Sequence, residues 1–165
     1  MYGLNTNTSQ FNFFSMKHKY EVSFKTRWSD FDPNRHMRHT AYNDYAAEVR
    51  VRFFEEHYFQ MNDFARYNIG PVLFKEETTF YKEIHIGENI TGDMELLSAT
   101  PGFERWVFLH HIYNQKGEIS AKIKVTGAWI DLKKRKLTSL PEEILTILKD
   151  LPKSDDFMEM KIKDK

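Results

Sequence analysis

One short segment of the chain holds most of the side chains that could do chemistry. Asp30, Asp32, Asn34, His36 and His39 occur within ten residues, just before a stretch in which apolar residues have helical spacing. The N-terminus of a helix presents unpaired backbone N–H groups and a favourable dipole, so it stabilises a developing oxyanion. A carboxylate or an imidazole beside it could take a proton from water. Together these parts suit the addition of water to an acyl carbonyl.

The same residues also have ordinary structural interpretations. Asp30 and Asp32 could serve as turn or N-cap acids, because such side chains bond their own backbone in loops. Asn34 could equally be a turn residue, and His36 could be an imidazole whose hydrogen bonds are satisfied at an interface. The residue types alone leave both interpretations open.

Charged residues on the following stretch extend this region. Glu48 lies twelve residues after His36 and could act as a further carboxylate, or could pair with Arg52 four residues later on a helix. The phosphates of coenzyme A or of a pantetheine arm could be held by a group of nearby arginines, Arg35, Arg38, Arg50 and Arg52. Ordinary surface charge is the simpler interpretation of these arginines.

Histidines occur in two close pairs, His36 with His39 and His110 with His111. Neither pair has carboxylate or thiolate partners at the spacing typical of metal ligands. The second pair lies in a predicted strand, where adjacent side chains point to opposite faces and cannot bind one ion together. We therefore predict no metal site. The chain also lacks the Gly-x-Ser-x-Gly motif of α/β-hydrolases and any glycine pattern that cradles phosphates, and we expect no cofactor.

The composition describes one globular domain with no electrostatic attraction to nucleic acid. The chain has 165 residues, with 24 lysines and arginines against 24 aspartates and glutamates. The absence of cysteine excludes disulfides, thiolate metal sites and cysteine nucleophiles. No apolar run reaches the ~18 residues that a membrane-spanning helix needs, and the N-terminus has no signal-peptide pattern. We expect a cytoplasmic protein without nucleic-acid partners.

Periodicity predicts the elements that position the polar segment. Residues 20–28 alternate apolar and polar side chains, as in a half-buried strand, and lead into a turn-rich loop over residues 29–35. From residue 40 to about residue 58 the apolar residues recur at steps of three and four, which predicts an amphipathic helix. Four further strands are predicted over residues 72–86, 89–99, 105–113 and 119–131, followed by a short helix over residues 142–151.

This order of elements predicts an α+β domain in which one curved antiparallel sheet wraps around a single central helix. We place the domain at residues 19–151, with a poorly ordered leader over residues 1–18 and a charged C-terminal tail over residues 152–165. Phe157, Met158 and Met160 could dock part of that tail. Such a sheet has exposed edges, and pairing them with a second copy is the usual remedy, so we expect at least a dimer.

The loop and the helix resemble a known family signature. Asp30-Phe-Asp32-x-Asn34-x-His36-Met37, followed by Tyr42 and Glu48, is similar to the D-x-D-x-N-x-H-V-N-N-x-x-Y…E signature of hotdog-fold thioesterases of the acyl-ACP branch. It also resembles the D-x-D…Y pattern of the 4-hydroxybenzoyl-CoA type, and the resemblance covers about residues 19–137. Three features depart from it: Arg38 and His39 replace two asparagines, Arg35 replaces a frequent glycine, and Ile84 replaces a glutamate, with Glu83 beside it.

The resemblance implies a hotdog fold, a homodimer or dimer of dimers, and cofactor-free hydrolysis of an acyl-CoA or acyl-ACP thioester to a free acid and a thiol. Asp32 would be the general base or the nucleophile, while Asn34 and His36 orient water and the carbonyl oxygen, and Glu48 is a further catalytic candidate. The thioester carbonyl would lie against the helix N-terminus, near residues 39–41. The implied substrate-binding residues are Arg35, Arg38, His39, Thr40, Tyr42 and Tyr45. A tunnel for a medium to long acyl chain would be lined by Tyr42, Tyr45, Ala46 and Val49.

Two other functions fit the same fold. One is a hotdog hydratase or dehydratase that acts on enoyl or 3-hydroxyacyl thioesters, although the D-x-D-x-N-x-H loop favours hydrolysis. The other is a non-catalytic protein that binds acyl thioesters, and Arg38 and His39 in place of the asparagine pair are its best support. The fold alone does not choose among them.

Overall fold

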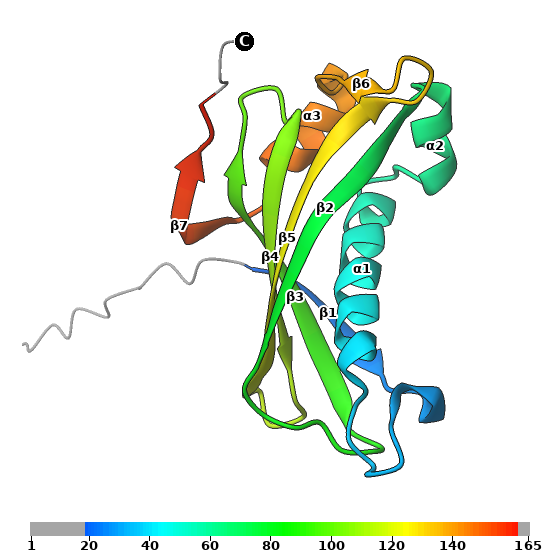
Figure 1. Cartoon of the computed structure of the whole chain (residues 1–165), viewed down its shortest axis with the longest axis vertical. Helices are drawn as coiled ribbons and strands as arrows, with labels where there is room; N and C mark the ends of the chain where they lie inside the picture. The colour runs from blue at the N-terminus through cyan, green and yellow to red at the C-terminus, as the bar shows by residue number, and fades with distance from the viewer. Residues whose placement is uncertain (1–18, 162–165) are drawn as a thin grey trace, which may run out of the picture.

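One long helix, α1 (His39–Glu56), lies along one face of a curved sheet (Figure 1). The computed structural model describes residues 19–161, so the leader predicted over residues 1–18 lies outside the described part of the chain. The sheet is built from β1 (Tyr20–Lys25), β2 (Ile69–Phe80), β3 (Asn89–Ala99), β4 (Arg105–Tyr113), β5 (Ile119–Asp131), β6 (Lys136–Leu137) and β7 (Lys153–Glu159). Two short helices, α2 (Met61–Arg66) and α3 (Glu142–Lys149), and a 3-10 turn, Trp28–Asp30, complete the described elements.

The strands follow the order β1-β3-β4-β5-β2, and each neighbouring pair is antiparallel. The short strand β6 is added to β5, and β7 runs parallel to β3. This arrangement confirms the predicted α+β architecture, with a curved antiparallel sheet around one central helix. Strand β2 is the last strand of this order, so it lies at an edge of the sheet.

Helix α1 approaches the sheet closely because small residues meet at the contact. Ala41, Ala46 and Val49 are completely buried on the face of α1 that packs on the strands. A Cβ atom at Gly92 of β3 would lie only 2.8 Å from Cγ2 of Val49. Any side chain at this position would therefore push α1 away from the sheet.

Aromatic rings fill the space between the C-terminal end of α1, α2 and the sheet. Phe54 of α1, Phe64 of α2 and Trp129 of β5 contact one another with ring centroids 5.2–6.3 Å apart. The sequence pattern did not predict α2, because this helix has six residues and buries only Phe64. Helix α2 is held in the fold by the contacts of Phe64 with the other aromatic rings, and a single buried residue gives no periodic pattern in the sequence.

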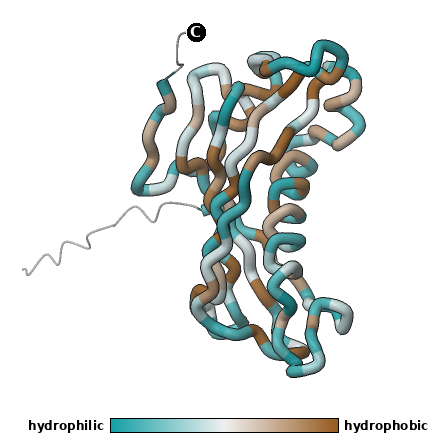
Figure 2. Tube along the Cα trace, viewed as in Figure 1, coloured by the Kyte–Doolittle hydropathy of each residue, from teal (hydrophilic) through white to brown (hydrophobic). Residues whose placement is uncertain are grey.

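Half-buried and exposed residues alternate along β1, as the period of two requires, whereas β3 and β4 are buried along most of their length, and the tube in Figure 2 shows hydrophilic and hydrophobic residues along the strands. Strand β1 ends at Lys25, earlier than the predicted residue 28, because the chain turns into the 3-10 segment Trp28–Asp30. Strand β2 begins at Ile69 and ends at Phe80, whereas residues 72–86 were predicted, and α3 ends at Lys149 instead of residue 151. The other three predicted strands have the predicted bounds.

Half of the charged tail predicted over residues 152–165 is a strand, because Lys153–Glu159 forms β7. Strand β1 pairs with β3 only as far as Met94, which leaves the rest of that edge of β3 without a neighbour. Strand β7 takes this place, pairing with β3 between Leu96 and Ala99. Phe157 packs against the core, which is the docking that the sequence allowed for. Backbone pairing thus orders a segment whose composition looks like a solvated tail.

Candidate active site

The polar loop is held against the chain that follows β2. The backbone N–H of Met37 donates to the carbonyl of Ile84 at 2.9 Å, and His36 forms an antiparallel bridge with His85. Met37 and Ile84 are both buried, so their side chains anchor this contact in the core. The loop before α1 is therefore a supported structure, with its polar side chains in defined positions.

Asp32 shapes the turn within this loop. Its Oδ1 accepts hydrogen bonds from the backbone N–H of Asn34 at 2.9 Å and from that of His36 at 3.1 Å. Arg35 has a φ of 68°, the left-handed region that favours glycine. Glycine, which the resembled signature often has at this position, adopts such a conformation without strain. One carboxylate oxygen of Asp32, Oδ1, thus stabilises the turn, as the structural interpretation predicted. Asn34 contributes its backbone N–H to this turn.

Asp30 is a structural acid. Its carboxylate is fully buried and accepts hydrogen bonds from the backbone and guanidinium of Arg27 and from the hydroxyl of Tyr45. Burial alone would raise the pKa of Asp30, but the hydrogen bonds from Tyr45 and Arg27 outweigh it and lower the pKa below its ordinary value. Burial, together with the bond to Asp30, raises the pKa of Tyr45 to about 12. The hydroxyl of Tyr45, a residue predicted to bind substrate, is therefore engaged with Asp30.

A cavity of about 360 Å³ opens where the loop, the start of α1 and the end of β2 meet. Four of the predicted site residues line it, namely Asp32, His36, His39 and Tyr42. The other lining residues are Met37, Phe80, Tyr81, Lys82 and Glu83. The loop and the helix N-terminus thus come together around one space, as the chemistry proposed from the sequence requires.

Several predicted site residues do not line this cavity. Arg38 donates from Nε to the carbonyl of Ser29 and from its terminal nitrogen to Oγ1 of Thr40, both at 2.9 Å. These bonds tie the loop to the first turn of α1, so Arg38 and Thr40 have structural roles in the described chain. Asn34 and Arg35 are exposed outside the cavity.

Glu48 also lies away from the cavity. Its Oε1 accepts a hydrogen bond from Nε of Arg52 at 3.0 Å, and both side chains are about half exposed. This is the helix-face pair that the sequence offered as the simpler interpretation. The structure does not bring Glu48 to the site where a catalytic carboxylate would act.

The predicted acyl tunnel along α1 is filled. Tyr45, Ala46 and Val49 belong to the hydrophobic core, and Ala46 and Val49 are completely buried. Of the four residues expected to line a tunnel, only Tyr42 faces the cavity. The sequence could not show this, because an apolar stripe on a helix looks the same whether it packs against a sheet or lines a channel.

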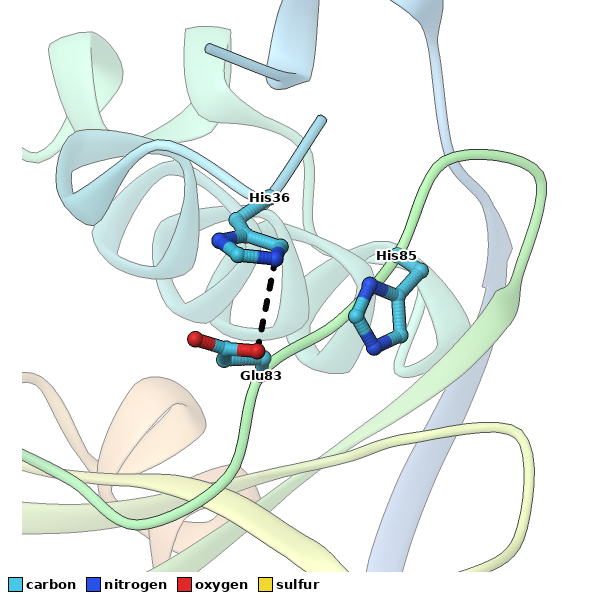
Figure 3. A group of neighbouring side chains, drawn as sticks. All are labelled: His36, Glu83 and His85. Carbon is cyan, nitrogen blue, oxygen red and sulfur yellow. Dashed lines mark ion pairs between the residues drawn. The ribbon is translucent and has the colours of Figure 1, made fainter. Parts of the chain in front are cut away.

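The strand side of the cavity was missed by the sequence analysis. Ile84, which stands where the resembled family has a glutamate, is completely buried, whereas its neighbour Glu83 lines the cavity. Nε2 of His36 lies 3.3 Å from Oε2 of Glu83, and the ring of His85 lies 5.2 Å from the ring of His36 (Figure 3). The available signal was the alternation of polar Glu83 and His85 around apolar Ile84, which indicates an extended segment with one polar side.

The second histidine pair divides between the two faces of the sheet, as predicted. Nε2 of His110 lies 3.1 Å from Arg50 of α1, and its Nδ1 lies 2.8 Å from the carbonyl of Asp93. The side chain of His111 instead contacts the carboxylate of Asp93. Burial, with a contribution from Arg50, lowers the pKa of His110 to about 3, so the buried ring is neutral at pH 7. Arg50 thus contacts His110 and does not line the cavity that contains Asp32.

A family model described as the thioesterase-like superfamily matches residues 26–148. The chain belongs to this superfamily. The match covers the loop, α1 and the strands, so the resemblance seen in the sequence to hotdog-fold thioesterases is confirmed. Comparison with curated protein sequences finds no match.

Solved structures of similar fold agree with this membership. A protein from Staphylococcus aureus solved in complex with CoA is 19% identical, with a TM-score of 0.75 over 84% of this chain and 89% of that chain. A 1,4-dihydroxy-2-naphthoyl-CoA thioesterase from Synechocystis is 15% identical, with a TM-score of 0.73 over 81% and 98%. A gentisyl-coenzyme A thioesterase is 15% identical, with a TM-score of 0.66 over 76% and 98%. At these identities the likeness concerns the fold. In the described residues of the thioesterase-like chain, no helix is both long enough and apolar enough to cross a membrane.

Proposed function

We propose that the protein hydrolyses an acyl-CoA thioester to a free acid and coenzyme A, with Asp32 as the residue that activates water. The observation that carries this proposal is the position of Asp32 in the cavity beside His36 and the first turn of α1. Membership of the thioesterase-like superfamily supports the reaction class. CoA is favoured over ACP as the carrier because the similar structures include CoA thioesterases and a CoA complex.

The two oxygens of Asp32 have different environments. Oδ1 is held by two backbone N–H groups, whereas Oδ2 has no hydrogen-bond partner within residues 19–161. The fixed oxygen orients the carboxylate, and the free oxygen is available to a water molecule or to the substrate. His36 lies at the same cavity and would orient that water.

The helix N-terminus offers the complementary half of the site. The N–H of Ala41 is already bonded to the carbonyl of Arg38, and that of Arg38 to the carbonyl of Asp30. Among the described residues, the N–H groups of His39 and Thr40 have no such partner, so they are the candidates for an oxyanion hole. The proposed oxyanion hole thus omits residue 41 from the range 39–41 at which the sequence placed the thioester carbonyl.

The proposed reaction then has two steps. The Oδ2 atom of Asp32 takes a proton from water as the water oxygen bonds to the carbonyl carbon, and the carbonyl oxygen becomes an oxyanion at His39 and Thr40. The oxyanion collapses, the carbon–sulfur bond breaks, and Asp32 returns its proton to the departing thiolate. Direct attack by Oδ2 on the carbonyl, followed by hydrolysis of the mixed anhydride, uses the same geometry.

The cavity favours a compact aromatic acyl group over the long chain expected from the sequence. The rings of Tyr42 and Phe80 lie edge to face with centroids 5.2 Å apart, and Tyr81 lines the same space. Aromatic groups pack well against such rings. With the interior beside α1 filled by core residues, a long apolar chain has no tunnel within one described chain.

A homodimer formed through β2 is part of this proposal. Strand β2 lies at the sheet edge and carries exposed apolar side chains, including Leu73, Phe74 and Phe80. An apolar hollow of about 200 Å³ beside it is lined in part by Val51, Leu73 and Trp106. An unpaired apolar edge strand favours pairing with a second copy, which would also bring new residues toward the cavity.

The deciding experiment is an assay of thiol release from a panel of aryl-CoA, acyl-CoA and acyl-ACP substrates. Release of the thiol from an aryl-CoA, with loss of that release in Asp32→Asn, is the expected result. Hydration of an enoyl-CoA without thiol release would replace the proposal with a hydratase. Binding of acyl-CoA without any turnover would replace it with a non-catalytic binding protein.

A further inference from the structure

We propose that His36, Glu83 and His85 form a binding site for one Zn²⁺ ion at the rim of the cavity (Figure 3). Each residue offers one ligand atom, and the three atoms all lie within 4.8 Å of one another. The sequence analysis predicted no metal site because His36 and His39 lacked a carboxylate partner nearby in the chain. The fold supplies that partner, together with a second imidazole, from the segment after β2.

The distance between the first two ligands fits a zinc site. Nε2 of His36 and Oε2 of Glu83 are 3.3 Å apart. Bonds of about 2.0–2.2 Å at tetrahedral angles place neighbouring ligand atoms about 3.3–3.5 Å apart. The two atoms can therefore bind one ion with little movement, and rotation of the exposed His85 ring completes the set.

Backbone pairing holds the three positions in place. His36 and His85 are partners in an antiparallel bridge, so their side chains lie on the same side of the paired segments. Glu83, two residues before His85, places its Oε2 atom 3.3 Å from Nε2 of His36. Between them, Ile84 is completely buried on the opposite side and anchors the segment. The backbone bridge and the buried Ile84 therefore hold the positions from which the three side chains extend.

The ligand types select the ion. Two imidazoles and one carboxylate suit Zn²⁺ and leave a fourth position for water, whereas Mg²⁺ and Ca²⁺ prefer oxygen ligands. His36 and Glu83 both line the cavity, so the fourth position would open toward it. The nearby cation Lys82 is engaged with Glu118, which removes a charge that would otherwise compete for Glu83.

A second group of potential ligands, Asp93, Glu95 and His111, does not offer an equivalent site. The carboxylate of Asp93 accepts hydrogen bonds from the hydroxyl of Tyr113 at 2.8 Å and from the ammonium of Lys19 at 3.3 Å. A metal ion would have to displace that ammonium. Among the described residues no lysine or arginine pairs with the His36 cluster, and its ion pair is that between His36 and Glu83.

The test is zinc titration of the chain, prepared without a polyhistidine tag and stripped with a chelator. We expect calorimetry to give one Zn²⁺ per chain with micromolar or tighter affinity, and no competition from Mg²⁺. His85→Ala and Glu83→Gln should each weaken this binding at least tenfold, because each removes one of three ligands. Zinc at a hundredfold excess over its dissociation constant should raise the Tm by roughly 5 °C.

Two variants serve as matched controls. His39→Ala removes an exposed histidine that lines the same cavity but lies outside the cluster, and His111→Ala removes the imidazole of the second group. Both should bind zinc as the unmodified chain does. The proposal is overturned if no stoichiometric binding occurs, if His85→Ala binds zinc equally well, or if His111→Ala is the variant that loses it. None of these readouts depends on hydrolysis, so the result stands apart from that of the proposed function.

Discussion

The hydroxyl of Tyr45 donates a hydrogen bond of 2.5 Å to the buried carboxylate of Asp30. This contact ties the loop to the second turn of α1 and separates the roles of two acids that are only two residues apart. Both carboxylate oxygens of Asp30 accept hydrogen bonds inside the protein, whereas Asp32 has one oxygen available at the cavity. The two acids should therefore respond to substitution in opposite ways.

Asp32→Asn should lower kcat/KM for thioester hydrolysis by at least ~100-fold, because the amide cannot accept the proton from water. The amide oxygen can still accept the two backbone N–H bonds of the turn, so the Tm should change little. Thiol release and thermal unfolding measure the two effects. Activity equal to that of the unmodified protein would move the chemistry to another residue of the cavity, with His36 first in line.

Asp30→Ala should destabilise the fold by about 2–3 kcal/mol, because it leaves the buried hydroxyl of Tyr45 without a partner. Tyr45→Phe removes the other side of the same bond and should cost less, about 1–2 kcal/mol. Urea unfolding gives both free energies. If Asp30→Ala were as stable as the unmodified protein while losing activity, Asp30 would be the catalytic acid and the assignment above would be reversed.

Stability should fall in mildly acidic solution because of His110. The pKa of this ring is about 3 in the folded chain and 6.5 as the ordinary value, so the unfolded chain binds a proton that the folded chain does not. With respect to this group, the free energy of unfolding has its full value above pH 6.5. It decreases as the pH falls from 6.5 toward 3, by about 1.4 kcal/mol per pH unit.

His110→Gln is the variant that isolates this contribution. Glutamine keeps a polar side chain beside Arg50 but cannot take up a proton. The slope of the free energy of unfolding against pH, measured between pH 6 and pH 4, should therefore decrease by the amount that corresponds to about one proton. Urea unfolding at a series of pH values provides the measurement. An unchanged slope would assign the acid sensitivity to other groups.

Leu73→Glu on β2 should convert the proposed dimer into a monomer, because it places a charge on the edge that would pair with the second copy. Met158→Glu on β7 is a matched control, since Met158 is also exposed and apolar but lies on a different strand. Light scattering reports the mass of each variant. A stable monomer of the unmodified protein with full activity would refute the dimer and any contribution of a partner to the site.

Substrate preference should follow the aromatic lining of the cavity. We expect kcat/KM to be higher for benzoyl-CoA or a hydroxylated naphthoyl-CoA than for saturated acyl-CoAs from C4 to C16. Phe80→Ala should reduce this preference by roughly tenfold, because a ring contact is worth about 0.5–1.5 kcal/mol beyond area burial. A maximum at C12 to C16 would instead restore the long-chain preference inferred from the sequence.

The sequence by itself determined the elements and the segment where chemistry could occur. The helical period of α1 and the turn residues that separate β3, β4 and β5 are local properties, so the bounds of these elements were predicted closely. The family signature, read from adjacent residues, identified the loop and ranked Asp32 above Asp30.

Only the tertiary structure decided what depends on contacts between distant segments. Burial of Tyr45 against Asp30, the loss of the tunnel beside Val49 and the parallel pairing of β7 with β3 all involve residues that local patterns cannot bring together. The same is true of Glu83 and His85, which reach His36 across a backbone bridge between segments almost fifty positions apart. A periodic pattern shows which face of an element is apolar, but the neighbour that covers that face is chosen by the packing of the whole chain.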